Sequence, residues 1–256
     1  MQGMVPLSGF GGVPYSAVRK AAPRNILDNS DFTNLVAQAG IGGNHGSIAY
    51  AADRWILDSG KVSYKAGVGL TLNGTIRQKL EFPPTGETSA FVGMASGAAS
   101  ISYADGAVTI TSSGGVLKWA ALYGGVYSAA AMPDYQPKGY GAELAECQRY
   151  YIKMDRVFTA GWVSGSARTY YIPVSIPVGM RLLPTVTMDG YIGRIYNGYS
   201  NHTGPQVTAP ESLKAYVSSP FESGLIVLQD TVDTAVDVNN SIVAFQLNNT
   251  ILSADL

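Results

Sequence analysis

Apolar and polar residues alternate over many short stretches of the chain, which is the pattern of half-buried β-strands. Within residues 75–82, Ile76, Gln78 and Leu80 share one face. Further strands are predicted at 61–65, 68–72, 101–103, 108–111 and 116–122, and later at 150–158, 168–178, 185–188, 191–196, 213–217, 225–230 and 242–247. Turns recurring roughly every eight to twelve residues favour β-sandwiches.

One segment, Gly141–Tyr151, has a helical period instead. Leu144, Cys147 and Tyr151 recur at i, i+3 and i+7, so they fall on one helix face. The acidic residues of the segment lie early in it, where a helix N-terminus favours negative charge. We predict a short helix that joins two β-rich halves.

Prolines and apolar runs refine the strand prediction for the second half of the chain. Pro173, Pro177 and Pro184 lie in or beside predicted strands, so these positions should be edges, bulges or strand starts. Leu225–Leu228 is apolar on both faces, which favours a central strand. The last residues, 251–256, are expected to close the final sheet.

Residues 1–24 differ from the rest of the chain. Gly and Pro punctuate the segment, and it has no sustained period. We expect it to be an attachment arm that binds a partner; packing on its own domain is the alternative.

Composition narrows the classes of function. Apolar residues make up 46% of the chain, enough for a core, whereas charged residues are only 14%, against a usual level of roughly 25%. The net charge is −1 and the Lys and Arg residues are scattered, so we expect no nucleic-acid partner. Surfaces rich in Ser, Thr, Asn, Gly and Tyr suit sugars or another subunit.

The cysteine content and the patterns for targeting or membrane insertion narrow the class of protein further. A single cysteine, Cys147, excludes an intramolecular disulfide and a thiolate zinc site. No run approaches the length of a membrane span, and no signal-peptide pattern is visible at the N-terminus. We expect synthesis in a cytoplasm, no membrane insertion and no cofactor.

Five segments resemble, in order, those of one family. Asn25–Phe32 followed by Asp53–Trp55 looks like the start of jelly-roll modules in bacteriophage and prophage tail-fibre proteins. Glu143–Tyr151 is similar to the helix that follows those modules. Met180–Thr187 and Ser253–Leu256 resemble their C-terminal β-domain.

The resemblance implies an all-β virion appendage. The expected organisation is an arm or linker at 1–24, a jelly-roll module at 25–138, and a short helix with a second β-sandwich at 139–256. The jelly roll resembles carbohydrate-binding modules, and such fibres are usually trimers. The expected partners are therefore further copies in a homotrimer, a tail or capsid protein bound through residues 1–24, and host surface polysaccharide.

Candidate catalytic residues are few, and we expect no enzyme. The two histidines, His45 and His202, come without a G-x-S-x-G elbow, and His45 is interpreted as a solvated loop residue. Acid pairs such as Asp28 with Asp31, or Asp53 with Asp58, could cleave glycosides. Asp28 and Asp53 are better explained as acceptors for backbone donors in turns.

A metal site is not expected either. Three acids, Asp230, Asp233 and Asp237, are candidates for calcium, but their spacing fits no EF-hand. A solvated face between two strands explains them better.

The best binding candidate is the Gly-containing loop after residue 195. Tyr rings can stack on the apolar faces of sugars, and Asn and His side chains can hydrogen-bond their hydroxyls. The candidate ligand-binding residues are Tyr196, Asn197, Tyr199, Asn201 and His202. A subunit interface is the alternative, favoured for Tyr191 and equally good for Tyr199. The second choice of site is Trp119, Tyr123 and Tyr127.

We therefore predict a virion protein, made in the host bacterial cytoplasm, that presents a surface to a host glycan. A purely structural tail or capsid decoration protein without ligand is the main alternative. A glycan depolymerase is a third possibility.

Overall fold

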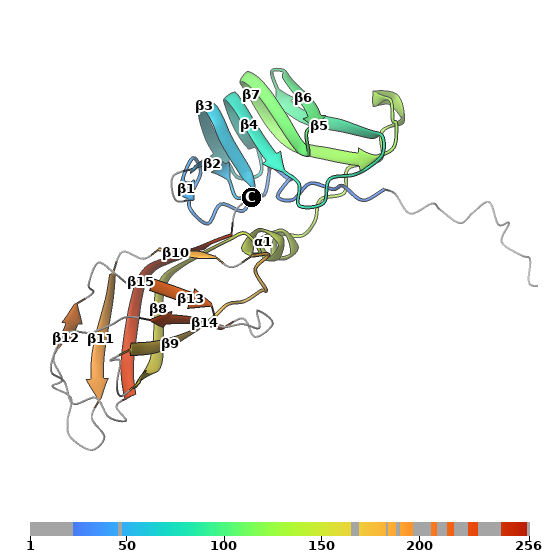
Figure 1. The fold of residues 1–256 in the computed structure, drawn as a ribbon. Helices are drawn as coiled ribbons and strands as arrows, with labels where there is room; N and C mark the ends of the chain where they lie inside the picture. Colours follow the sequence, from blue (N-terminus) through green and yellow to red (C-terminus); the bar gives the residue numbers. More distant parts are fainter. Residues whose placement is uncertain are drawn as a thin grey trace, which may run out of the picture.

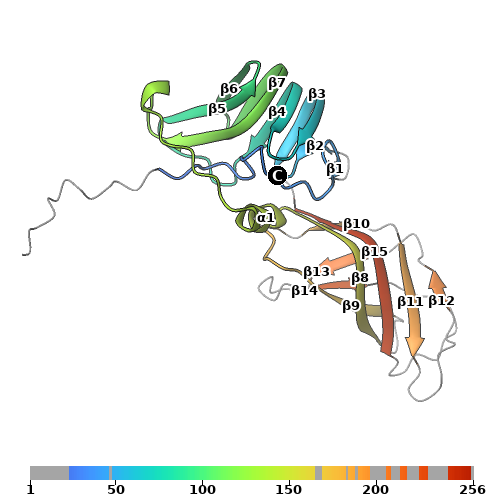
Figure 2. The same ribbon diagram turned by 180° about the vertical axis from the view of Figure 1, so that it is seen from behind.

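The structure is a computed structural model that describes residues 23–45, 48–164, 169–182, 184–187, 190–196, 206–208, 214–217, 225–229 and 242–254. Within these residues the protein is all-β, as predicted, with one α-helix, α1 (Tyr140–Gln148), and one 3₁₀ turn, η2 (Ala129–Ala131). Two antiparallel sheets, built from separate stretches of sequence, lie on opposite sides of α1 (Figures 1 and 2).

The first sheet has seven strands. Their order is β1-β2-β3-β4-β7-β5, and β6 also pairs with β7. The strands are β1 (Asn44–His45), β2 (Ile48–Ala52), β3 (Trp55–Lys65), β4 (Gly69–Lys79), β5 (Thr88–Ser96), β6 (Ala99–Ala104) and β7 (Ala107–Gly124). This order does not establish a jelly roll, and the boundaries at 24 and 138 stay predictions.

Strand β7 organises the first sheet because it has different neighbours along its length. Its first part pairs with β4 and β6, and its second part pairs with β5. The N-terminal segment also reaches it, since the N–H of Ile26 donates to the carbonyl of Leu122 at 3.0 Å. Gly114, at φ +109°, lies where the register with β4 shifts, a conformation that favours glycine.

The core of the first sheet confirms the predicted alternation. Ile76, Gln78 and Leu80 are all buried, as one face of a strand. Ile76 and Leu80 belong to a hydrophobic cluster whose other large, fully buried members are Leu27, Phe32, Trp55, Leu70, Leu72, Ile110, Leu117 and Leu122. Burial of this apolar surface stabilises the sheet and fixes the N-terminal segment against it.

The second sheet has eight strands in the order β12-β11-β15-β8-β9-β14-β13, and β10 also pairs with β15. The strands are β8 (Tyr151–Ser164), β9 (Thr169–Ser175), β10 (Thr185–Thr187), β11 (Gly190–Tyr196), β12 (Gln206–Thr208), β13 (Lys214–Val217), β14 (Leu225–Gln229) and β15 (Ile242–Ser253). The prediction for Leu225–Leu228 is confirmed, since β14 has neighbours on both sides.

The structure agrees with one further expectation for the second half of the chain and changes two others. Pro184 immediately precedes β10, as expected of a strand start. Residues 251–253 lie in the second sheet as the end of β15, between β8 and β10, so they do not close it as a separate strand. Helix α1 ends at Gln148, so Tyr151 begins β8 instead of completing the helix face.

Candidate functional site

Segments far apart in the sequence meet beside α1, and they include the five segments on which the predicted family resemblance rests. The N–H of Asn29 donates a hydrogen bond of 2.6 Å to Oε2 of Glu143, which is buried in the first turn of α1. We call this meeting point the joint. It comprises the polar contacts of Asp28, Asn29, Asp53, Arg54, Glu81, Lys138, Glu143, Arg149, Tyr150 and Arg181.

Asn29 ties three segments together. Its φ of +47° lies in the left-handed region, which Asn tolerates better than most residues. Its Nδ2 donates to the carbonyls of Val36 and Asp53, at 2.8 and 2.7 Å. The indole N–H of Trp55 donates to the carbonyl of Asn29 at 2.9 Å. A buried amide satisfied on several sides holds these turns in one arrangement.

Arg54 packs flat against the next segment. Its guanidinium carbon lies 3.5 Å from the centre of the Tyr150 ring, a cation–π contact. Its Nη2 donates to the carbonyl of Lys79 at 2.8 Å, and its Nε lies 3.5 Å from the carboxylate of Asp28. Lys138 approaches the same carboxylate at 3.2 Å. Arg54 therefore joins the end of β4 to the residue just before β8.

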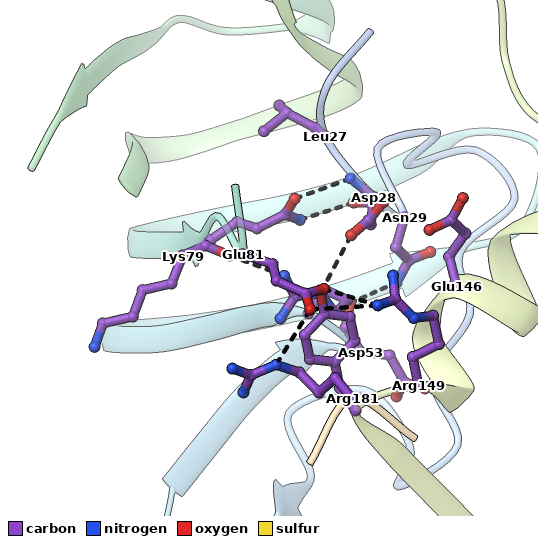
Figure 3. Close-up of polar contacts among 12 residues, drawn as sticks. Leu27, Asp28, Asn29, Asp53, Lys79, Glu81, Glu146, Arg149 and Arg181 are labelled. Atoms are coloured by element: carbon purple, nitrogen blue, oxygen red, sulfur yellow. Dashed lines mark hydrogen bonds and ion pairs between the residues drawn. The ribbon is translucent and has the colours of Figure 1, made fainter. Parts of the chain in front are cut away.

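Glu81 is the second anion of the joint (Figure 3). Its carboxylate accepts a 2.7 Å hydrogen bond from the Tyr150 hydroxyl. Arg149 lies 3.1 Å from it and Arg181 lies 3.9 Å from it. Since Arg149 and Tyr150 follow α1 and Arg181 follows β9, this carboxylate links the first sheet to the second half of the chain.

Backbone contacts complete the joint. The N–H of Arg181 donates to the carbonyl of Arg149 at 2.9 Å, and the N–H of Ala254 donates to the carbonyl of Tyr150 at 2.7 Å. Nε2 of Gln38 donates to Asp53 and to the carbonyl of Tyr151, each at 2.7 Å. All five segments that carry the resemblance thus supply residues to one place.

A pocket of about 260 Å³ opens beside these contacts. Its walls are the N-terminal segment around Asp28, the Arg54 side chain, residues 80–82 after β4, and the region of α1 from Lys138 to Tyr150. The carboxylates in the wall are each paired with a cation, so the arrangement fixes and orients charges. A general acid or base would need a carboxyl group that is not held in an ion pair with a cation.

Burial changes the titration of several groups near the joint. It raises the pKa of Glu143, which exposes only 1% of its surface, and this outweighs the opposing hydrogen bond from Asn29 and the charge of Lys138. Burial likewise raises the pKa of the Tyr150 hydroxyl and of the Cys147 thiol. Cys147 is therefore a small buried residue of α1, as the helix pattern indicates.

The predicted glycan-binding loop lies largely outside the described residues. Of its members, Asn197, Tyr199, Asn201 and His202 are not described, and only the strand backbone of Tyr196 is. Tyr196 pairs with Ile242, which pairs with Trp162 near the end of β8. From Tyr151 to Trp162 a strand rises roughly 35 Å, so Tyr196 lies at the end of the sheet away from the joint.

The second choice of site is packed internally. Tyr123 is 1% exposed and contacts the rings of Phe91 and Tyr127. Trp119 lies over Gly93, where a Cβ atom would collide with the indole, and stacks on Tyr135 with ring centres 4.9 Å apart. Tyr123 and Trp119 therefore pack within the protein, whereas Tyr127 is half-buried and meets Tyr123 in an edge-on arrangement.

His45 is not the solvated loop residue that its Gly-rich surroundings indicate. It is buried between the rings of Tyr50 and Tyr151, whose centres lie 3.9 and 3.6 Å from its own. Its Nε2 lies 3.7 Å from Oδ1 of Asp53. Strand β1 brings it there by pairing with β2, and it serves as packing between the first sheet and β8.

The candidate acid pairs have other partners. Asp53 accepts a hydrogen bond from the N–H of Gln38, and Asp31 accepts one from the N–H of Thr33, as expected of turn residues. Asp28 instead pairs with cations, and Asp58 pairs with Arg77 at 2.9 Å. Residues 230–241, with the three acids considered for calcium, lie outside the described residues. No group of at least three potential metal-ligating side chains occurs in the described part of the chain.

Sequence reasoning missed Glu81 and the arginines of the joint. By its spacing Glu81 falls on the face opposite Ile76, Gln78 and Leu80, and nothing in local spacing pairs it with Arg149 or Arg181. The available signal was the resemblance itself, because Arg54, Arg149, Tyr150 and Arg181 all lie within the segments that carry it.

Comparison of the chain with protein-family models, with curated proteins and with solved structures gives no match. Over the described residues, none of the helical structure has the length and apolar character needed to cross a membrane.

Proposed function

We propose that the protein is a structural and adhesive appendage of a virion, of the tail-fibre or receptor-binding class, that presents a surface to a host glycan. The observation that carries the proposal is the convergence of all five resemblance-bearing segments on one joint. Segments that resemble a family by chance have no reason to meet in space. If the resemblance is one of architecture, it explains why Asn29, Glu143 and Arg54 stand at the positions where they connect these segments.

The arrangement of the sheets suits such a role. The N-terminal segment enters beside the joint, where Arg24 pairs with Glu146 at 3.3 Å. The strand that leads into the Tyr196–His202 loop ends roughly 35 Å from the joint. In this proposal residues 1–24 attach the protein to a particle, and Tyr196 with the residues that follow it contacts the host glycan.

Imaging of the particle tests this proposal. Purified particles that carry an epitope tag after Leu256 would be labelled with an antibody fragment and examined by electron microscopy. We expect the label at a regular position on the tail or capsid. Absence of the chain from purified particles, with the tagged protein still made in the infected cell, would contradict an appendage role.

A purely structural decoration protein is the second candidate, and one observation favours it. The ring of Tyr123 is buried and that of Trp119 is already stacked on Tyr135, so neither ring is fully free to stack on a sugar. A particle-bound protein that fails to bind any fraction of host envelope would support this reading over adhesion.

A depolymerase is less well supported. Asp28 and Glu81 each have cationic partners, Lys138 and Arg54 for the former and Arg149 for the latter. Incubation with host polysaccharide should release no new reducing ends if the protein only binds. Release of reducing ends that depends on Asp28 or Glu81 would assign hydrolysis to it.

A further inference from the structure

The pocket at the joint combines an apolar rim with charges of both signs. Phe82, which exposes 77% of its surface, lines the pocket at its rim, and Ile26 and Leu80 line the wall nearby. The ring of Tyr150 forms part of the interior, with the Arg54 guanidinium stacked on it. A ligand there would meet an aromatic side chain at the entrance and polar groups inside.

The volume limits the size of the ligand. Small-molecule pockets usually enclose roughly 300 to 1,000 Å³, and this one encloses about 260 Å³. The space therefore suits a single ring and excludes a longer oligosaccharide from lying fully inside.

The charges define the chemistry of the ligand. Four cationic side chains line the pocket, Arg24, Arg54, Lys138 and Arg149, against three carboxylates, Asp28, Glu81 and Glu146. Arg24 and Arg149 expose 78% and 37% of their side chains. In each, the contact to its carboxylate uses Nη2, while a guanidinium carries several more N–H donors.

Such a lining discriminates between small anions. Near neutral pH a large share of inorganic phosphate is the dianion HPO4²−, so the three carboxylates would repel it more strongly than they repel a ligand with a single negative charge. A sugar hydroxyl can donate to a carboxylate and accept from a guanidinium, and a single carboxylate on the ring would match the excess cation. The apolar face of the ring can stack on Phe82.

We propose that this pocket binds one sugar ring that carries a carboxylate, such as a uronic acid unit of an acidic polysaccharide. The site lies at the joint, far from the strand position of Tyr196, and goes beyond the proposed function. If binding fails at one of the two sites, the proposal for the other site is unaffected.

Titration of the full-length protein with glucuronate, glucose and inorganic phosphate, followed by NMR chemical shifts, tests the proposal. We expect saturable binding of glucuronate with a dissociation constant on the order of millimolar. Glucose should bind at least about tenfold more weakly, since that factor corresponds to one lost charged contact of roughly 1.4 kcal/mol. Phosphate should not compete with glucuronate.

Two exposed positions allow the pocket to be changed without disturbing the fold. Phe82→Ala removes the rim, and Arg24→Gln removes an exposed cation. Each should weaken glucuronate binding severalfold. Matched controls are Phe158→Ala, an equally exposed phenylalanine on β8, and Arg77→Gln, which also loses one surface ion pair. No saturable glucuronate binding, equal binding of glucose, displacement by phosphate, or equal effects of the control variants would each overturn the proposal.

Discussion

The backbone N–H of Asn29 donates a 2.6 Å hydrogen bond to the carboxylate of Glu143, across 114 residues of sequence. Both residues are buried, so the bond is shielded from water. It joins the turn at the start of the first sheet to the first turn of α1.

The stability of the joint should depend on pH through Glu143. Because burial raises its pKa in the folded protein above the ordinary 4.5, the folded state holds the proton more tightly than the unfolded state. Its stabilising contribution is full below pH 4.5 and is lost as pH rises through the folded pKa. We expect the free energy of unfolding of the native protein, relative to Glu143→Gln, to fall across this range in denaturant titrations.

The Glu143→Gln variant is the matched control, because its amide oxygen can still accept from Asn29 but does not titrate. The charges facing this position, Lys138 and Asp28, are the same in both proteins. A relative stability that rises with pH would mean that the pairing with Lys138 outweighs burial. Glu143→Ala, which leaves the buried N–H of Asn29 unsatisfied, should cost about 1–3 kcal/mol.

Replacement of Arg54 by lysine, which keeps the charge but not the planar guanidinium, should destabilise the folded protein. Arg54→Lys loses the planar stack on Tyr150 and the geometry of the bond to Lys79, both in a buried setting. We expect a loss of about 1–3 kcal/mol in chemical denaturation. Arg77→Lys is the control, since its pair with Asp58 is half-exposed and should contribute under about 1 kcal/mol. Equal losses for the two variants would contradict the importance of the stack.

Deletion of residues 1–24 should leave the described fold intact and abolish incorporation into particles. Arg24 is exposed, whereas Asn25 is buried and bonds to Ala120 and Leu122 at 3.0 and 2.9 Å. Deletion of residues 1–30 is the contrasting variant, because it also removes Leu27 and Asn29 from the core. Thermal unfolding should be nearly unchanged for the shorter deletion and strongly lowered for the longer one. A large loss of stability in the shorter deletion would move the boundary toward the N-terminus.

The protein is expected to form a homotrimer, on the basis of its low charge, its many tyrosines and the fibre resemblance. Light scattering at micromolar concentration should give about three times the chain mass of 27.0 kDa. A monomer mass across a wide concentration range, in the presence of intact residues 1–24, would contradict this expectation.

The strands were largely predictable because alternation reports a half-buried sheet directly. Ile76, Gln78 and Leu80 are buried together as their spacing predicts. Strand β5 (Thr88–Ser96) was missed, since its small residues and glycine give no clear alternation. The pattern also divided β4 and β7 into two strands each, because Gly74 and Gly114 interrupt them without ending them.

The joint could be predicted only in part, because it depends on contacts between distant segments. Local spacing places Glu143 near a helix N-terminus but gives no sign that Asn29 will reach it. His45 lies among glycines, which indicate an exposed loop, yet the pairing of β1 and β2 carries it between two tyrosine rings. Burial of such residues follows from tertiary packing and not from their neighbours in sequence.

Attachment to host cells is the most direct test of the adhesive role. The purified protein would be labelled and incubated with cells of the strain on which the particle grows, and bound label would be measured against protein concentration. The double variant Tyr196→Ala with Tyr199→Ala removes the rings of the loop, and Tyr140→Ala removes a tyrosine that is 47% exposed on α1. The account predicts saturable attachment by the native protein and by Tyr140→Ala, and its loss in the double variant at unchanged oligomer mass. Equal attachment by the double variant would exclude the loop, and absence of attachment by the native protein to any host envelope fraction would contradict adhesion altogether.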